Sequence, residues 1–152
     1  MTALIATFLA AALYLGGTLY QLHCLRQRQT ASPSILRGVG VLALIAHAIS
    51  LYGEIFTGQG LSFGFFHVSS LIAWLVIAVI LAFSLRAPVT SLLLVLFPVA
   101  LIAKLLAWLL PDQGAATVPG HSALLVHVLL SILAYGILTI AAFQASLLAV
   151  QN

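Results

Sequence analysis

The sequence predicts an all-α, polytopic transmembrane helical bundle, and three observations lead to this fold class. Of the 152 residues, 64% are hydrophobic and only 5% are charged, whereas soluble globular domains carry roughly 25% charged residues. The apolar residues form continuous runs of the length that a helix needs to cross a bilayer, about 20 residues. These runs also lack the alternation of polar and apolar residues that is typical of a transmembrane β-barrel. We therefore expect most of the surface to face lipid.

Five runs are long enough to span the membrane, and they leave almost no residues for a soluble domain. The first lacks the basic residues that precede the apolar core of a secretory signal, so we expect it to remain as an anchor. Turn-like segments separate the others: TASPS, GQGLSFG, the Arg86 to Pro88 turn, and PDQGAATVPG. The predicted spans of this single transmembrane domain are residues 3–22, 35–56, 65–85, 89–110 and 122–150.

Basic residues in the short loops predict the orientation of the chain. Arg26, Arg28 and Arg37 lie at the first loop and Arg86 at the third, whereas the second and fourth loops carry no Lys or Arg. Lys and Arg are retained on the cytoplasmic side of membrane proteins. We therefore expect a multi-pass membrane protein with an outer N-terminus and a cytoplasmic C-terminus. The net charge of +3 then reflects topology, and we expect no nucleic-acid partner.

The sequence contains no motif of a known class of catalytic site. Cys24 is the only cysteine, which excludes an intrachain disulfide and a CxxCH haem-attachment motif. Phosphate-binding glycine loops, zinc spacings such as HExxH and nucleophile elbows do not occur either, so we expect a protein that is not an enzyme. Gly16, Gly17, Gly38 and Gly40 are interpreted as points of close helix contact, because small residues let helix backbones approach.

A few polar residues within the spans are the best candidates for a functional role. His47, Ser50 and Glu54 share one face of the second span, which should point into the bundle. Two interpretations of His47 stay open: a neutral histidine bonded to a neighbouring helix, or a ligand or proton relay. Lys104 lies in the fourth span, and we expect its long side chain to reach outward past Trp108 to the membrane interface.

Three histidines are predicted near the outer face of the membrane. His67 begins the third span, where it is either an interfacial polar residue or a ligand. His121 and His127 lie about 120° apart around the fifth helix and roughly 9 Å apart along it, so they cannot jointly bind one ion. His127 is the better placed of the two. Ser131 and Tyr135 follow it at helical spacing, and we expect this stripe to pack against neighbouring helices.

The order of these features resembles the amino-terminal half of the CcsA-type cytochrome c assembly proteins, especially their short bacterial inner-membrane relatives of the YpjD type. The similar segments are residues 44–52 (LIAHAISLY), 60–75 (GLSFGFFHVSSLIAWL), 97–111 (FPVALIAKLLAWLLP) and 124–151 (LLVHVLLSILAYGILTIAAFQASLLAVQ). The segment 124–151 is the most specific, because His127, Val128 and Tyr135 match the family pattern H-V-x-x-x-x-x-x-Y.

The resemblance implies a membrane protein that handles haem transiently and presents it for attachment to apocytochrome c on the outer side of the membrane. His127 would then be an axial haem ligand. His47 matches no family ligand, and His47, His67 and His121 remain weaker candidates for haem binding; no metal other than haem iron is expected. The resemblance also implies that this multi-pass protein lies in the bacterial inner (plasma) membrane. The family's tryptophan-rich motif and second outer histidine do not occur in these 152 residues. We therefore expect a fragment of a longer cytochrome c assembly domain.

A second hypothesis comes from a different functional class. The face formed by His47, Ser50 and Glu54, together with the missing tryptophan-rich motif, is compatible with a non-catalytic accessory subunit of a membrane ion transport system. The expected partners are the lipid bilayer and, under the first hypothesis, apocytochrome c or other assembly proteins. The two hypotheses differ in their requirement for haem.

Overall fold

The structure is a computed structural model that describes residues 2–57, 60–62, 64–110, 117–118 and 122–151. Four of its helical segments are long and apolar enough to cross a membrane: Thr2–Arg26, Pro33–Ile55, Phe65–Phe83 and Thr90–Leu109. The described helices are α1 (Thr2–Arg26), α2 (Pro33–Ile55), α3 (Phe65–Phe83), the short 3₁₀ helix η1 (Thr90–Leu92), α4 (Leu93–Leu109) and α5 (Ser122–Gln151). The predicted all-helical class and the predicted breaks between helices agree with these bounds.

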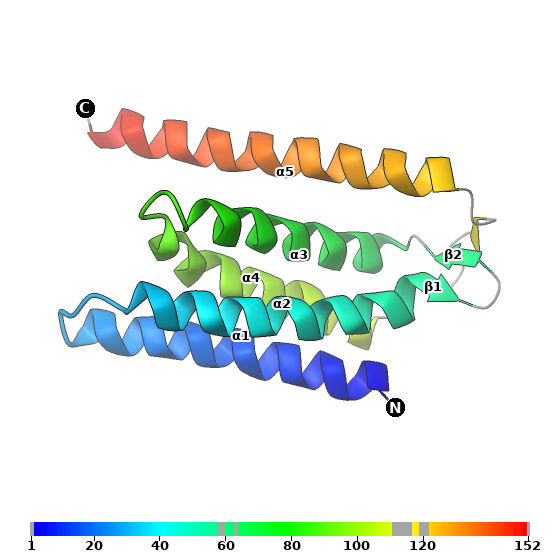
Figure 1. Cartoon of the computed structure of the whole chain (residues 1–152), viewed down its shortest axis with the longest axis horizontal. Helices are drawn as coiled ribbons and strands as arrows, with labels where there is room; N and C mark the ends of the chain where they lie inside the picture. The colour runs from blue at the N-terminus through cyan, green and yellow to red at the C-terminus, as the bar shows by residue number, and fades with distance from the viewer. Residues whose placement is uncertain (1, 58–59, 63, 111–116, 119–121, 152) are drawn as a thin grey trace.

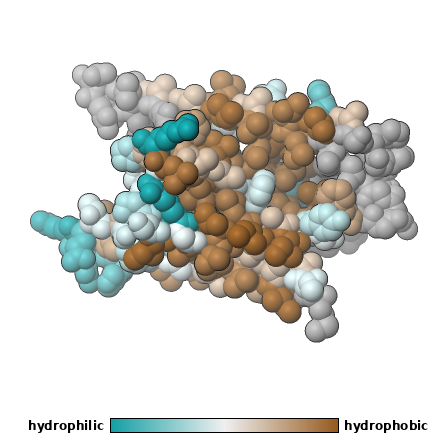
Figure 2. Space-filling model, viewed as in Figure 1, coloured by the Kyte–Doolittle hydropathy of each residue, from teal (hydrophilic) through white to brown (hydrophobic). Residues whose placement is uncertain are grey.

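Helices α1 to α4 form a four-helix bundle, and α5 lies outside it. In the bundle α1 packs on α2 and α4, and α3 packs on the same two helices, so that α2 and α4 face each other diagonally. Helix α5 packs against α3 and forms the top layer in Figure 1. The bundle core is apolar, with Tyr14, Leu36, Ile77 and Phe97 almost fully buried. Figure 2 shows apolar side chains over the middle of the visible face, as a lipid-facing surface requires.

A small antiparallel sheet ties two of the connecting loops together. Strands β1 (Phe56–Thr57) and β2 (Gly60–Ser62) come from the loop after α2, and β3 (Thr117–Val118) comes from the loop after α4. β2 is the central strand: Phe56 pairs with Leu61, and Leu61 pairs with Val118. These strands were not predicted from the sequence, because two or three residues are too few for an alternating pattern to be recognised.

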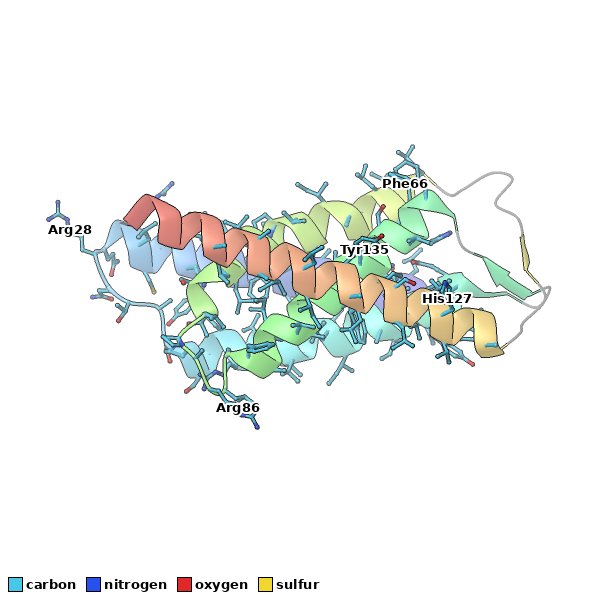
Figure 3. All side chains as sticks on the ribbon, turned by 90° about the horizontal axis from the view of Figure 1, so that it is seen from above. Arg28, Phe66, Arg86, His127 and Tyr135 are labelled. Atoms are coloured by element: carbon cyan, nitrogen blue, oxygen red, sulfur yellow. The ribbon has the colours of Figure 1, made fainter. Side chains whose placement is uncertain are left out.

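The two ends of the bundle differ in charge. The sheet marks one end, which we call the sheet end (Figure 1). Arg28 and Arg86 lie at the other end, the arginine end, and Figure 3 shows both of them far from His127. The loops α1–α2 and α3–α4 therefore share one end of the bundle, as the predicted distribution of basic residues requires.

The glycine prediction was correct for two of the four positions. A Cβ at Gly17 would lie 2.6 Å from Cε2 of Phe97, and one at Gly40 would lie 2.9 Å from both Cδ atoms of Leu81. Gly16 and Gly38 have no neighbouring atom within 4 Å of such a Cβ, so the prediction of helix contact was wrong there. Gly16 and Gly38 lie on exposed parts of their helices, whereas Gly17, the next residue, and Gly40, two residues further on, are buried.

Candidate functional site

A column of polar side chains runs along the inner face of α2. His47 and Ser50 are fully buried, and the side chain of Glu54 is 17% exposed. Their spacing of three and seven residues keeps them within one sector of the helix. The prediction that this face points into the bundle is therefore confirmed. Because α2 ends at Ile55, Glu54 lies near the sheet end and His47 lies about two turns deeper.

Glu54 forms an ion pair across the diagonal of the bundle. Nζ of Lys104 donates a hydrogen bond to Oε1 of Glu54 over 2.5 Å, and the Lys104 side chain is completely buried. The expectation that Lys104 extends outward past Trp108 was wrong. The rotation of α4 turns Lys104 toward a carboxylate on α2, which compensates its charge better than lipid can. Trp108 instead packs edge-on against Phe8, with 5.2 Å between ring centroids.

Two hydroxyl groups extend this ion pair toward α1. Oγ of Ser50 donates to Oε1 of Glu54 over 3.0 Å, and this Ser50 oxygen lies 2.6 Å from Oγ1 of Thr7. Thr7 in turn donates to the backbone carbonyl of Ala3 over 3.0 Å. Lys104, Glu54, Ser50 and Thr7 therefore form one hydrogen-bonded chain that links α4, α2 and α1.

His47 is bonded to two different helices. Nδ1 of His47 lies 3.1 Å from Oη of Tyr14 on α1, and Nε2 lies 2.9 Å from Oγ of Ser70 on α3. Both partners are buried hydroxyl groups, and a hydroxyl group can either donate or accept a hydrogen bond. Each ring nitrogen of His47 therefore has a suitable partner in both neutral tautomers and in the doubly protonated form.

The polar column stops in the middle of the bundle. The ring of Tyr14 packs against Phe97 at a centroid distance of 5.6 Å, and Phe97 fills the space beside Gly17. Leu36 and Leu93, both at most 1% exposed, belong to the same apolar cluster. Within the described residues, this cluster separates the polar column from the arginine end, so the column does not form a continuous path through the bundle.

Three residues of the column were not predicted from the sequence, namely Thr7, Tyr14 and Ser70, and the direction predicted for Lys104 was wrong. Thr7 and Tyr14 are seven residues apart, which places them on the same face of α1. Polar residues at that spacing in an otherwise apolar segment were the signal that would have pointed to α1. No comparable signal identifies Ser70, because its role depends on how α3 is rotated against α2.

His127 does not face the bundle as expected. The residues of α5 that pack toward the other helices are Val128, Ile132, Gly136 and Ile140. At about 100° per residue, His127 lies about 160° from the mean direction of these four positions. It is exposed near the sheet end of the helix (Figure 3). The predicted inward stripe was wrong, since Tyr135 is also 72% exposed.

The remaining candidate histidines are His67 and His121. His67 lies in the first turn of α3 and is half-buried. His121 lies outside the described residues. In the part of the chain that the structure describes, no group of three His, Cys, Asp or Glu side chains is arranged to hold a metal ion.

An apolar cavity opens near the sheet end, between α2, α3 and α5. Its volume is about 200 Å³, and Leu51, Tyr52, Trp74 and Leu129 are among its lining residues. Sites for drug-sized ligands have volumes of about 300–1,000 Å³. The cavity is therefore too small to enclose a porphyrin, and a haem group bound by His127 would have to lie on the outer face of α5.

Comparison of the chain with protein-family models, with curated proteins and with solved structures gives no match.

Proposed function

We propose that this chain is a non-catalytic membrane protein that handles haem during cytochrome c assembly. In this proposal it spans the bacterial inner membrane five times, with an outer N-terminus, a cytoplasmic C-terminus and the sheet end outside. The observation that carries the proposal is the position of His127, exposed on α5 at the end of the bundle opposite to the arginines. The resemblance of residues 124–151 to the CcsA-type proteins supports the same ligand.

The surroundings of His127 fit one face of a haem group. Ala123 lies one turn before His127 and Ala134 about two turns after it, on the same outward side of α5, and both are exposed. Small side chains beside the imidazole leave room for the porphyrin plane, and Leu130 adds an exposed apolar contact. Among the described residues this face offers one histidine, so the second axial ligand and the cover come from a partner such as apocytochrome c or another assembly protein.

Haem absorption tests the proposal directly. The protein, purified in detergent and incubated with haem, is expected to show a Soret band that His127→Ala strongly weakens. His23→Ala is the matched control, because His23 is also exposed but lies at the arginine end, in the last turn of α1. Equal spectra for the wild type and His127→Ala would rule out His127 as the ligand.

A second candidate function is supported by the buried polar column. Ionisable residues inside a membrane are costly and usually functional, and here Lys104 and Glu54 lie in the bundle together with His47. This arrangement favours a non-catalytic accessory subunit of an ion transport system, since in the described part of the chain the column ends at the Phe97 cluster and forms no continuous path across the bundle.

Cells carrying His47→Ala test this alternative. The variant is expected to change ion sensitivity or the assembly of a partner complex, because it removes both bonds of His47, to Tyr14 and to Ser70. His47→Gln is the control that retains hydrogen-bonding capacity. Wild-type behaviour of His47→Ala in both assays would remove the support for this function.

A further inference from the structure

The hydrogen-bonded chain between Glu54 and Thr7 contains more contacts than protons. Three contacts run through the hydroxyl groups of Ser50 and Thr7: from Glu54 to Ser50, from Ser50 to Thr7, and from Thr7 to the carbonyl of Ala3. Each hydroxyl group carries one proton and can donate only once. Two protons cannot satisfy three contacts when Glu54 is ionised, because a carboxylate only accepts.

One additional proton on Glu54 satisfies the chain completely. The protonated carboxyl then donates to Ser50, Ser50 donates to Thr7, and Thr7 donates to the carbonyl of Ala3. The second carboxyl oxygen, Oε2, points to the same conclusion: it is buried and has no hydrogen-bond partner within the described part of the chain. A buried, unpaired carboxylate oxygen is costly, and protonation of the carboxyl removes its charge.

Glu54 also lies where a proton can reach it. Its side chain is 17% exposed, whereas its partner Lys104 is fully buried. It occupies the second-last position of α2, directly before the loop that forms the sheet. Within the described residues, access is from the sheet end, since the Phe97 cluster closes the other side of the column.

We propose that Glu54 is a proton-binding site that exchanges with the aqueous phase at the sheet end of the bundle. Hydronium transfers one proton to the carboxylate: one O–H bond of hydronium breaks, an O–H bond forms on Glu54, water is released, and the charge of Glu54 changes from −1 to 0. Lys104 keeps its own protons and loses its counter-ion, so the bond that joins α2 to α4 across the diagonal is weakened. The site is a protonation switch of the α2–α4 contact.

The titratable groups around the site are few. Across the described elements packed near Glu54 they are Tyr14 on α1, His47 on α2, His67 at the start of α3 and Lys104 on α4. Of these described groups, Lys104 is the one that bonds directly to the carboxylate. The inference does not depend on haem binding; it deepens the ion-transport alternative by naming the proton as the ion.

Infrared difference spectroscopy between neutral and acidic pH tests whether Glu54 becomes protonated. The chain contains two acidic side chains, Glu54 and Asp112. Acidification of the purified protein in lipid nanodiscs is expected to produce the C=O stretching band of a protonated carboxyl group. The part of this band that Glu54 contributes should be missing in Glu54→Gln and present in Asp112→Asn, which is the matched control.

A second variant covers the case in which Glu54→Gln fails to fold. Lys104→Gln removes the counter-ion, so the carboxyl band is expected already at neutral pH, because a buried carboxylate without a partner is unfavourable. A wild-type spectrum without a pH-dependent carboxyl band would overturn the proposal, as would a band that Glu54→Gln leaves unchanged in intensity and position. The ion-transport alternative is tested in cells through His47, so its failure is distinguishable from failure of proton binding at Glu54.

Discussion

The ion pair between Lys104 and Glu54 provides the sharpest test of how the bundle is held together. We consider the variants Lys104→Met and Glu54→Gln and their combination at neutral pH. At the observed 2.5 Å, two unit charges attract each other by about 6–7 kcal/mol if the effective dielectric constant is about 20. Desolvation of the two ions costs several kcal/mol each, so the net contribution of the intact pair is small.

The single and double substitutions should therefore behave very differently. Removal of one partner leaves a buried, uncompensated charge, which typically costs about 3–5 kcal/mol. We expect Lys104→Met to reach this range and Glu54→Gln to reach its lower part. The double variant removes both charges and should cost less than either single change. The resulting interaction energy is at least about 3 kcal/mol, at or above the upper end of the values for residues in contact.

The free energy of unfolding can be measured in mixed detergent micelles, with far-ultraviolet circular dichroism as the signal. A control cycle combines Glu54→Gln with Arg86→Met, because Arg86 is exposed at the opposite end of the bundle and should not be coupled to Glu54. If the effects of Lys104→Met and Glu54→Gln add to within about 0.5 kcal/mol, the two residues do not form the pair on which our reasoning depends.

Two further predictions concern packing and topology. Gly17→Ala should destabilise the bundle by about 1–3 kcal/mol, because the new methyl group would overlap Phe97. Gly16→Ala, its neighbour with open space, should be neutral or stabilise the helix by up to about 1 kcal/mol; equal unfolding free energies of the two variants would contradict the observed contact. A cysteine placed at the exposed position Gln29, in a variant with Cys24→Ser, should react with a membrane-impermeant maleimide in inverted vesicles and not in spheroplasts. The opposite labelling pattern would reverse the proposed orientation.

The sequence by itself determined where the helices lie and which residues of α2 share a face. Apolar runs of membrane-spanning length, broken by Pro, Gly and Arg, are local signals, and so the helix bounds agree with the prediction. The inward face of α2 followed from the spacing of His47, Ser50 and Glu54, since helical periodicity relates residues within one helix. The contacts of Gly17 and Gly40 were also predicted from their small size.

Only the tertiary structure decided how each helix is rotated about its own axis relative to its neighbours. In a lipid-facing bundle, nearly every side of a helix is apolar, so hydrophobicity alone does not distinguish the inner face from the outer face. Lys104 was expected to reach the interface but turns to Glu54, and His127 was expected to face the bundle but points away from it. Both outcomes depend on partners distant in sequence, and periodicity within one helix carries no information about them.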